Sequence, residues 1–169
     1  MSSGEADSGL GREVNLPDET IVVGVDGSDD ADRALRFAVD EAKVRAASLR
    51  VICAWELPVE NLSELGPPKE SLDRHRQRAE EIVAEAAETV ERLAPNVQCK
   101  CLALEGELGA VLLEHSSDAS LVVVARHGHG LGDRLLGSVA DAVLGSVSLH
   151  VVRDARCPVV VVPHASPPE

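Results

Sequence analysis

TIVVGVDGSDDADRALRFAVDEAKVRAASLRVICAW, residues 20–55, is the stretch that decides the fold. It opens with a continuous β-branched run to Asp26, the pattern of a strand buried on both faces. Ser28 can then cap a helix that has acidic residues in its first turn. Apolar residues recur at helical spacing in that helix, at Ala31, Ala34, Leu35, Ala38, Val39 and Ala42. A second buried strand at 49–55 completes a parallel strand–helix–strand unit.

The remainder of the chain repeats this alternation. The patterns predict a loop at 58–68, a charged helix at 71–93, an edge-like strand at 97–104, a short helix at 106–117, and strands at 121–125 and 158–163. Strands that alternate with helices indicate right-handed crossovers. We therefore predict an α/β fold with an open, five-stranded, parallel, doubly wound sheet, Rossmann-like, with helices on both faces. A single domain at 19–163 would lie between a disordered tail at 1–18 and a short tail at 164–169.

The composition limits the classes of partner. The 169 residues carry a formal charge of −13, from 29 acidic residues against 16 Lys and Arg, and only 1% are aromatic. An acidic surface repels nucleic-acid phosphates and anionic membranes, and single-stranded nucleic acid needs aromatic faces for base stacking. No apolar run approaches about 18 residues, and the N-terminus lacks a basic and an apolar signal region. We expect no nucleic-acid partner, no membrane association and a cytoplasmic location.

The four cysteines show no disulfide framework and no zinc pattern. Cys99 and Cys101 alternate with Lys100, so their side chains would leave a strand in the same direction. Cys53 and Cys157 stand alone, and no CxxC motif or Cys/His quartet is present. The sequence favours reduced, mostly buried thiols; a redox pair at Cys99 and Cys101 is the alternative.

A glycine-rich turn follows the strand at 121–125. The sequence from Val122 to Val139 reads VVVARHGHGLGDRLLGSV, and a helix is expected to begin within it. Glycine amides and a helix N-terminus suit an anion, and cationic or titratable groups gather there at Arg126, His127, His129 and Arg134. The turn is neither a P-loop nor a GxGxxG motif on the first strand. It predicts a phosphate site, with a tight connection that binds no ligand as the alternative.

At this point the chain resembles the universal stress protein family. The resemblance covers about residues 20–163 and is carried by IVVGVDGS, by LVVVARHG followed by LGSV, and by LGSVSLHVVRDARCPVVVVP. In the nucleotide-binding branch of that family the loop is similar to Gly-x₂-Gly-x₉-Gly-Ser/Thr. Here Ala125 stands at the first glycine, and only eight residues separate Gly128 from Gly137-Ser138. The methyl group of Ala125 would crowd a phosphate against that backbone.

The resemblance implies an adenine nucleotide alpha hydrolase-like fold that binds ATP, which Mg²⁺ can accompany. The adenine- and ribose-side contacts carry over to Gly24, Asp26, Ala54 and Val124. The phosphate contacts carry over to Ala125, Gly128, Gly137, Ser138 and Val139. Two of these positions have a simpler alternative, since Asp26 could cap a turn with Gly27-Ser28 and Ser138 could cap a helix.

A local duplication complicates the loop. Residues 135–142 and 143–150 look like tandem copies, each containing Leu-Gly-Ser-Val, and the second copy has the family-like distance to Cys157-Pro158. We expect one long helix from about Ser138 with Gly145 inside it. In the alternative, the helix starts at Ser146 and 129–144 is a flexible flap.

These observations predict an ATP-binding regulatory protein whose nucleotide-bound state is read by a protein partner. We assign no catalytic residues and no metal ligands, although slow ATP hydrolysis or autophosphorylation is compatible with the family. Two alternatives stay open: a nucleotide-free dimeric stress-response adaptor, favoured by Ala125 and the short spacer, and a nucleotide-transferring enzyme with the same layout. The apolar strand Val159–Val162 suits an edge that pairs with a second copy, so we expect a C2 homodimer.

Overall fold

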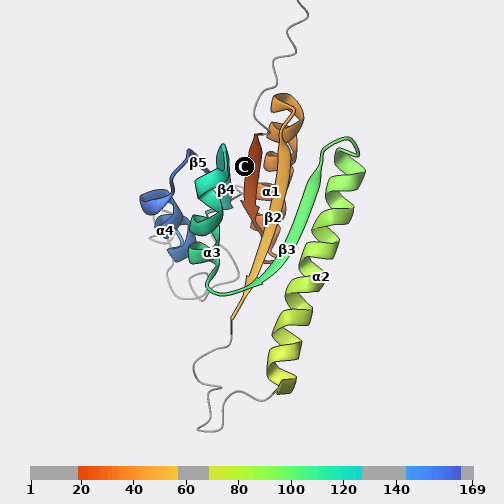
Figure 1. The fold of residues 1–169 in the computed structure, drawn as a ribbon, viewed down its shortest axis with the longest axis vertical. Coiled ribbons are helices and arrows are strands. Elements are labelled where there is room, and N and C mark those ends of the chain that lie inside the picture. Colours follow the sequence, from red (N-terminus) through yellow and green to blue (C-terminus); the bar gives the residue numbers. More distant parts are fainter. Residues whose placement is uncertain (1–18, 57–68, 127–143, 165–169) are drawn as a thin grey trace, which may run out of the picture.

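The computed structural model describes residues 19–56, 69–126 and 144–164 and contains one parallel five-stranded sheet (Figure 1). The strand order is β3-β2-β1-β4-β5. The strands are β1 (Thr20–Gly24), β2 (Ser48–Trp55), β3 (Cys99–Glu105), β4 (Leu121–Ala125) and β5 (Val159–Val162). All four pairings between neighbouring strands are parallel, as predicted. The predicted loop at 58–68 and the predicted tails, except for His164, lie outside the described residues.

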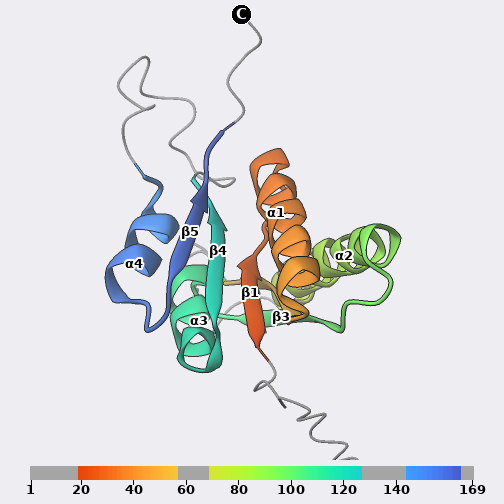
Figure 2. The same ribbon diagram turned by 90° about the horizontal axis from the view of Figure 1, so that it is seen from above.

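Helices cover both faces of the sheet, which confirms the doubly wound arrangement (Figure 2). The helices are α1 (Asp29–Arg45), α2 (Lys69–Leu93), α3 (Leu108–His115), which continues into the 3₁₀ turn η2 (Ser116–Asp118), and α4 (Ser146–Asp154). Buried residues of α1 and α2 form one apolar cluster with the sheet, and those of α3 and α4 form the second. Within the described residues, no helix is long and apolar enough to cross a bilayer.

The first helix forms as its sequence predicts. The hydroxyl oxygen of Ser28 accepts a hydrogen bond from the N–H of Ala31 at 3.1 Å and so caps α1. The apolar residues expected at helical spacing are all buried, namely Ala31, Ala34, Leu35, Ala38, Val39 and Ala42. Because four of these six side chains are alanine, α1 can pack close to the sheet.

The predicted long helix through Gly145 is wrong. Gly145 has an extended backbone (φ −60°, ψ 159°), and α4 begins only at Ser146. Glycine is a poor residue for a helix interior, and here its N–H donates to the carbonyl oxygen of Arg126 at 2.9 Å. The hydroxyl of Ser148 donates to the same oxygen at 3.1 Å. Both bonds fasten the first turn of α4 to the end of β4; the flap suggested for 129–144 falls almost entirely outside the described residues.

The cysteines are free, as expected, but they are not mostly buried. Only Cys53 is buried, whereas Cys101 and Cys157 are half-buried and Cys99 is exposed. Cys99 and Cys101 lie on β3, which is an edge strand and is covered less completely than the central strands.

Candidate functional site

The sheet has its topological switch point between β1 and β4. From β1 the chain proceeds through β2 to the β3 edge, and it then returns to the other side of β1 to form β4. In open α/β sheets, ligands bind in the crevice at the carboxyl ends of the strands where the winding reverses. Because Val23 pairs with Val123 and Gly24 pairs with Ile52, the segments that follow β1, β2 and β4 emerge at one edge.

Asp26 lies at this edge and caps a turn. Its Oδ1 accepts hydrogen bonds from the N–H of Ser28 at 3.0 Å and from the Ser28 hydroxyl at 2.6 Å. Between them, Gly27 has a φ of +81°, a value that favours glycine. The simpler reading of Asp26 as a capping residue is therefore confirmed. The same turn holds a half-buried carboxylate beside the switch point, where it can also accept hydrogen bonds from a ligand.

Gly24, the last residue of β1, has a packing reason to be glycine. A Cβ atom at this position would lie 2.9 Å from Cδ1 of Leu112, a fully buried side chain of α3. Gly24 thus allows α3 to pack closely on the sheet. Its backbone is two residues from Asp26 and lies at the predicted edge.

Ala54, Val124 and Ala125 lie on the strands that flank β1. Ala54, on β2, pairs with Leu104 of β3. Val124 and Ala125, on β4, pair with Val161 and Val162 of β5. Val124 is 3% exposed, so only its backbone can face a ligand, whereas Ala54 and Ala125 are half-buried. The structure therefore brings the described nucleoside-side residues to neighbouring strands at one end of the sheet.

The start of α4 brings the Gly145-Ser146 pair to this edge of the sheet, and the sequence analysis did not count these two residues among the ligand contacts. The carbonyl of Arg126 anchors Gly145 and Ser148, so the Gly145-Ser146 pair lies directly beside the end of β4. Gly145 is the N-cap, and among the described residues no side chain caps the first amides of α4. The predicted Gly128, Gly137, Ser138 and Val139 lie outside the described residues. In the sequence, Gly145-Ser146 rather than Gly137-Ser138 has the family-like distance to Cys157-Pro158, and this spacing could have identified Gly145-Ser146 as the start of the helix.

The electrostatics of this edge are mixed. The first turn of α1 contains Asp29, Asp30 and Asp32. Asp30 pairs with Arg33 and with Nδ1 of His164, the latter at 3.0 Å. Arg126 is the basic residue that follows β4. Acidic groups therefore lie after β1, and Arg126 and the first amides of α4 lie after β4, which suits a ligand with a neutral and an anionic end.

The buried thiol of Cys53 lies near Asp26 and has a raised pKa. Burial, and then the nearby Asp26 carboxylate, raise the pKa of Cys53 to about 11, while Arg78 acts in the opposite direction. Cys53 is therefore a protonated, apolar side chain under the site at neutral pH. Within the described ranges, no group of three or more His, Cys, Asp or Glu residues could hold a metal ion.

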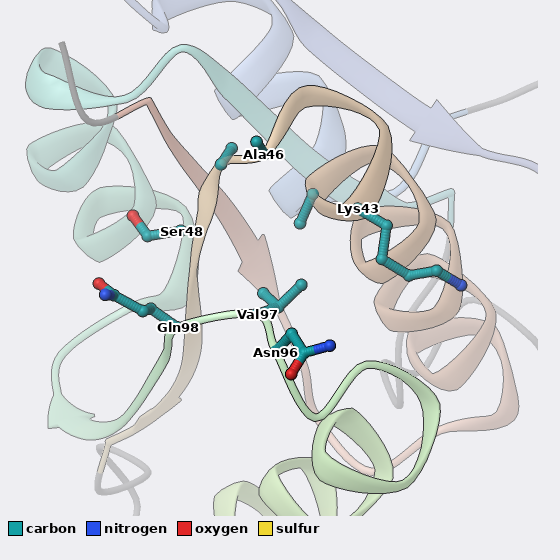
Figure 3. A pocket seen from close by; sticks show the side chains of 8 residues that line it. Lys43, Ala46, Ser48, Asn96, Val97 and Gln98 are labelled. Carbon is teal, nitrogen blue, oxygen red and sulfur yellow. The ribbon is translucent and has the colours of Figure 1, made fainter. Parts of the chain in front are cut away.

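A cavity of about 470 Å³ lies elsewhere (Figure 3). It is lined by Lys43 and Ala46 at the end of α1, by Ser48 at the start of β2, and by residues 96–98 before β3. These residues are at the amino ends of the strands, opposite the switch-point crevice, and they include none of the predicted site residues.

Comparison with known proteins agrees with this arrangement. The model of the Universal stress protein family matches residues 19–163. A universal stress protein of Thermus aquaticus is 37% identical over 148 residues, which cover 85% of this chain and 98% of that protein. One from Mycobacterium tuberculosis is 33% identical over 143 residues, which cover 85% of this chain and 47% of that protein. The chain thus spans about half the length of the mycobacterial relatives that it matches.

A solved structure provides a ligand-bound comparison. It is described as a universal stress protein in complex with cAMP, has a TM-score of 0.64 and is 27% identical, and the match covers 88% of this chain and 98% of that one. The family match spans nearly all the described residues, and the fold agrees with that of this solved structure. The chain belongs to the universal stress protein family.

Proposed function

We propose that this chain binds an adenine nucleotide at the carboxyl ends of β1 and β4 and acts as a regulatory protein through that binding. The observation that carries the proposal is the position of Gly145-Ser146, which the Arg126 carbonyl holds at the switch point. The first amides of a helix have no partner within the helix, and together with the helix dipole they attract phosphate.

The crevice suggests a direction for the ligand. Asp26, on the β1 side, would accept hydrogen bonds from the ribose or the adenine amino group. Gly145, Ser146 and Val147, at the start of α4, would face the phosphates. Sixteen residues separate Gly128 from Gly145, seven more than the family-like spacing, and the duplicated segment accounts for the additional length. Gly137, Ser138 and Val139 in the first copy remain a predicted alternative for the same role.

The adenine preference rests on relatives. A structure 27% identical to this chain is described as a complex with cAMP, and the sequence motifs resemble those of the ATP-binding branch. We propose ATP, with Mg²⁺, as the ligand in the cytoplasm. The role is a binding equilibrium that a protein partner reads, rather than turnover of a metabolite.

Thermal unfolding of the full chain with and without Mg-ATP tests the proposal. A ligand that binds only the native state adds about 2.7 kcal/mol at one hundred times its Kd, which for a chain of this length raises Tm by roughly 5–10 °C. Mg²⁺ with tripolyphosphate is the matched control for binding of phosphate alone. An unchanged Tm at millimolar Mg-ATP would remove the nucleotide assignment.

A nucleotide-free dimeric adaptor is the second candidate. Gly24 and Asp26 have structural explanations in this fold, as a contact with Leu112 and a cap for Ser28, and Ala125 stands where the family-like loop has glycine. This candidate predicts a dimer by light scattering and no change in Tm with Mg-ATP. Adenine released from the purified, heat-denatured protein and identified by mass would argue against it.

A further inference from the structure

An arginine of α2 lies at the end of the sheet where the nucleotide is proposed to bind. Because β2 and β3 are parallel, α2, which connects them, begins at the carboxyl ends of the strands (Figure 1). Arg78 and Ile82, near the middle of this helix, both lie against the turn that follows β1. A Cβ atom on Gly27 would be 3.2 Å from Cγ1 of Ile82 and 3.6 Å from Nη2 of Arg78. The Arg78 guanidinium is therefore held beside the turn that contains Asp26.

Arg78 brings a positive charge to the nucleoside side of the crevice. Burial and then Asp26 raise the pKa of the Cys53 thiol, and Arg78 is close enough to act on this thiol in the opposite direction. Cys53 directly precedes Ala54 on β2, so the guanidinium lies near the strand end assigned to the nucleoside. Carboxylates are otherwise frequent here, in the turn at Asp26 and in the first turn of α1.

The Arg78 side chain is accessible and only loosely paired. It is 59% exposed, and its ion pair within the described residues is a 3.5 Å contact between Nη1 and an oxygen of Glu81. Both partners of this pair are exposed, and an exposed pair of this kind contributes little to stability. The guanidinium can therefore leave Glu81 for a ligand with little loss.

The base of a nucleotide needs a flat or apolar group over its face. Aromatic side chains commonly supply it, but the chain has one Trp, one Phe and no Tyr. Phe37 is the central residue of α1, and Trp55, at the end of β2, packs against the apolar cluster of α1 and α2. The planar guanidinium of arginine also stacks on bases and aromatic rings. Arg78 has such a plane at the nucleoside end of the crevice.

We propose that the guanidinium of Arg78 covers one face of the bound base and thereby favours purine over pyrimidine nucleotides. This inference rests on the nucleotide binding proposed above and adds a contact from α2 to it. A two-ring purine has a larger face than a one-ring pyrimidine. Loss of the guanidinium plane should therefore weaken the binding of ATP more than that of CTP.

Calorimetric titration of the full chain with Mg-ATP and Mg-CTP tests the contact. Arg78→Ala is expected to raise the Kd for ATP by about fivefold to tenfold, to raise that for CTP less, and to leave binding of Mg-tripolyphosphate unchanged. Arg78→Lys keeps the charge but not the plane, so it is expected to lose most of the same preference for ATP. Arg76→Ala is the matched control, because it removes another exposed arginine of α2 that pairs with a glutamate, Glu80. It is expected to bind both nucleotides as the wild type does.

The possible failures separate this contact from the nucleotide site itself. If Arg78→Ala binds Mg-ATP with the wild-type Kd, the contact is wrong and the nucleotide proposal stands. If Arg78→Ala weakens ATP, CTP and tripolyphosphate equally and Arg78→Lys restores all three, Arg78 acts through its charge and not on the base. A wild-type chain that binds no Mg-ATP removes both proposals. Thermal melts that match the wild type establish that each variant is folded.

Discussion

The carbonyl oxygen of Arg126 accepts a hydrogen bond from the backbone N–H of Gly145 at 2.9 Å, although 18 residues separate them in the chain. The Ser148 hydroxyl shares this acceptor. The contact makes the second Leu-Gly-Ser-Val copy the start of α4 and places its serine beside the switch point of the sheet. The proposed placement of the phosphates at the start of α4 rests on this relationship.

Ser146→Ala and Ser138→Ala distinguish the two copies. A hydrogen bond to a charged group contributes about 1.5–3 kcal/mol, so loss of the Ser146 hydroxyl is expected to weaken ATP binding by about tenfold or more. Ser138→Ala, the same change in the other copy, is expected to leave the Kd nearly unchanged. Calorimetric titration with Mg-ATP measures both. The reverse ranking would assign the phosphates to the first copy.

Gly24→Ala tests the packing role of Gly24. The added methyl group would lie 2.9 Å from Cδ1 of Leu112, in a fully buried environment. Overpacking of this kind costs about 1–3 kcal/mol. Urea unfolding is expected to show this loss, and Leu112→Val in the same chain should recover part of it. If Gly24→Ala weakens ATP binding but leaves stability unchanged, the glycine serves the ligand and not the helix.

The sequence predicted the fold well, for reasons that particular residues explain. The β-branched run at Thr20–Gly24 can be buried on both faces, and Ser28 with the alanines of α1 specifies a capped helix that packs closely on the sheet. The five strands and the helices α2 and α3 begin and end within two residues of their predicted bounds. Local propensity and hydrophobic periodicity are sufficient to predict a helix or strand where both indicate the same structure.

The start of α4 could not be predicted in the same way. Both copies offer Gly-Ser followed by apolar residues at helical spacing, so the local pattern does not distinguish them. The choice depends on the Arg126 carbonyl, which is distant in sequence. The exposure of Cys99 was missed for a related reason, because alternation along a strand shows which side chains share a face but not how completely that face is covered.

The stability of the chain is expected to fall at alkaline pH through Cys53. Its pKa is about 11 in the folded chain, against 9.0 for the free thiol. The protonated thiol therefore stabilises the native state fully below pH 9, and this contribution of up to about 2–3 kcal/mol is lost as the pH rises through 11. Cys53→Ala should remove that part of the decline. Parallel curves of unfolding free energy against pH for the wild type and Cys53→Ala would contradict the prediction.

Val161→Pro tests dimerisation through the edge strand β5. The N–H of Val122 donates to the carbonyl oxygen of Pro158, and the N–H of Arg126 donates to the carbonyl oxygen of Val162. Residues 158, 160 and 162 therefore direct their backbone groups toward β4. Val161 directs its N–H to the outer edge, where proline removes a donor needed only by a second copy. The wild type is expected to be a dimer by sedimentation at micromolar concentration, and Val161→Pro a monomer with the same circular dichroism.

Two outcomes would contradict the dimer. A wild-type chain that sediments as a monomer at micromolar concentration excludes the interface. A Val161→Pro variant that remains a folded dimer places the interface on another surface.

Hydrogen–deuterium exchange with and without Mg-ATP tests the nucleotide site most directly. The account predicts that saturating Mg-ATP slows exchange at the amides of residues 145–148 and 26–28, while the amides around the cavity at 96–98 exchange at an unchanged rate. Unchanged exchange at 145–148, under conditions where calorimetry shows ATP bound, would contradict the placement of the phosphates at the start of α4.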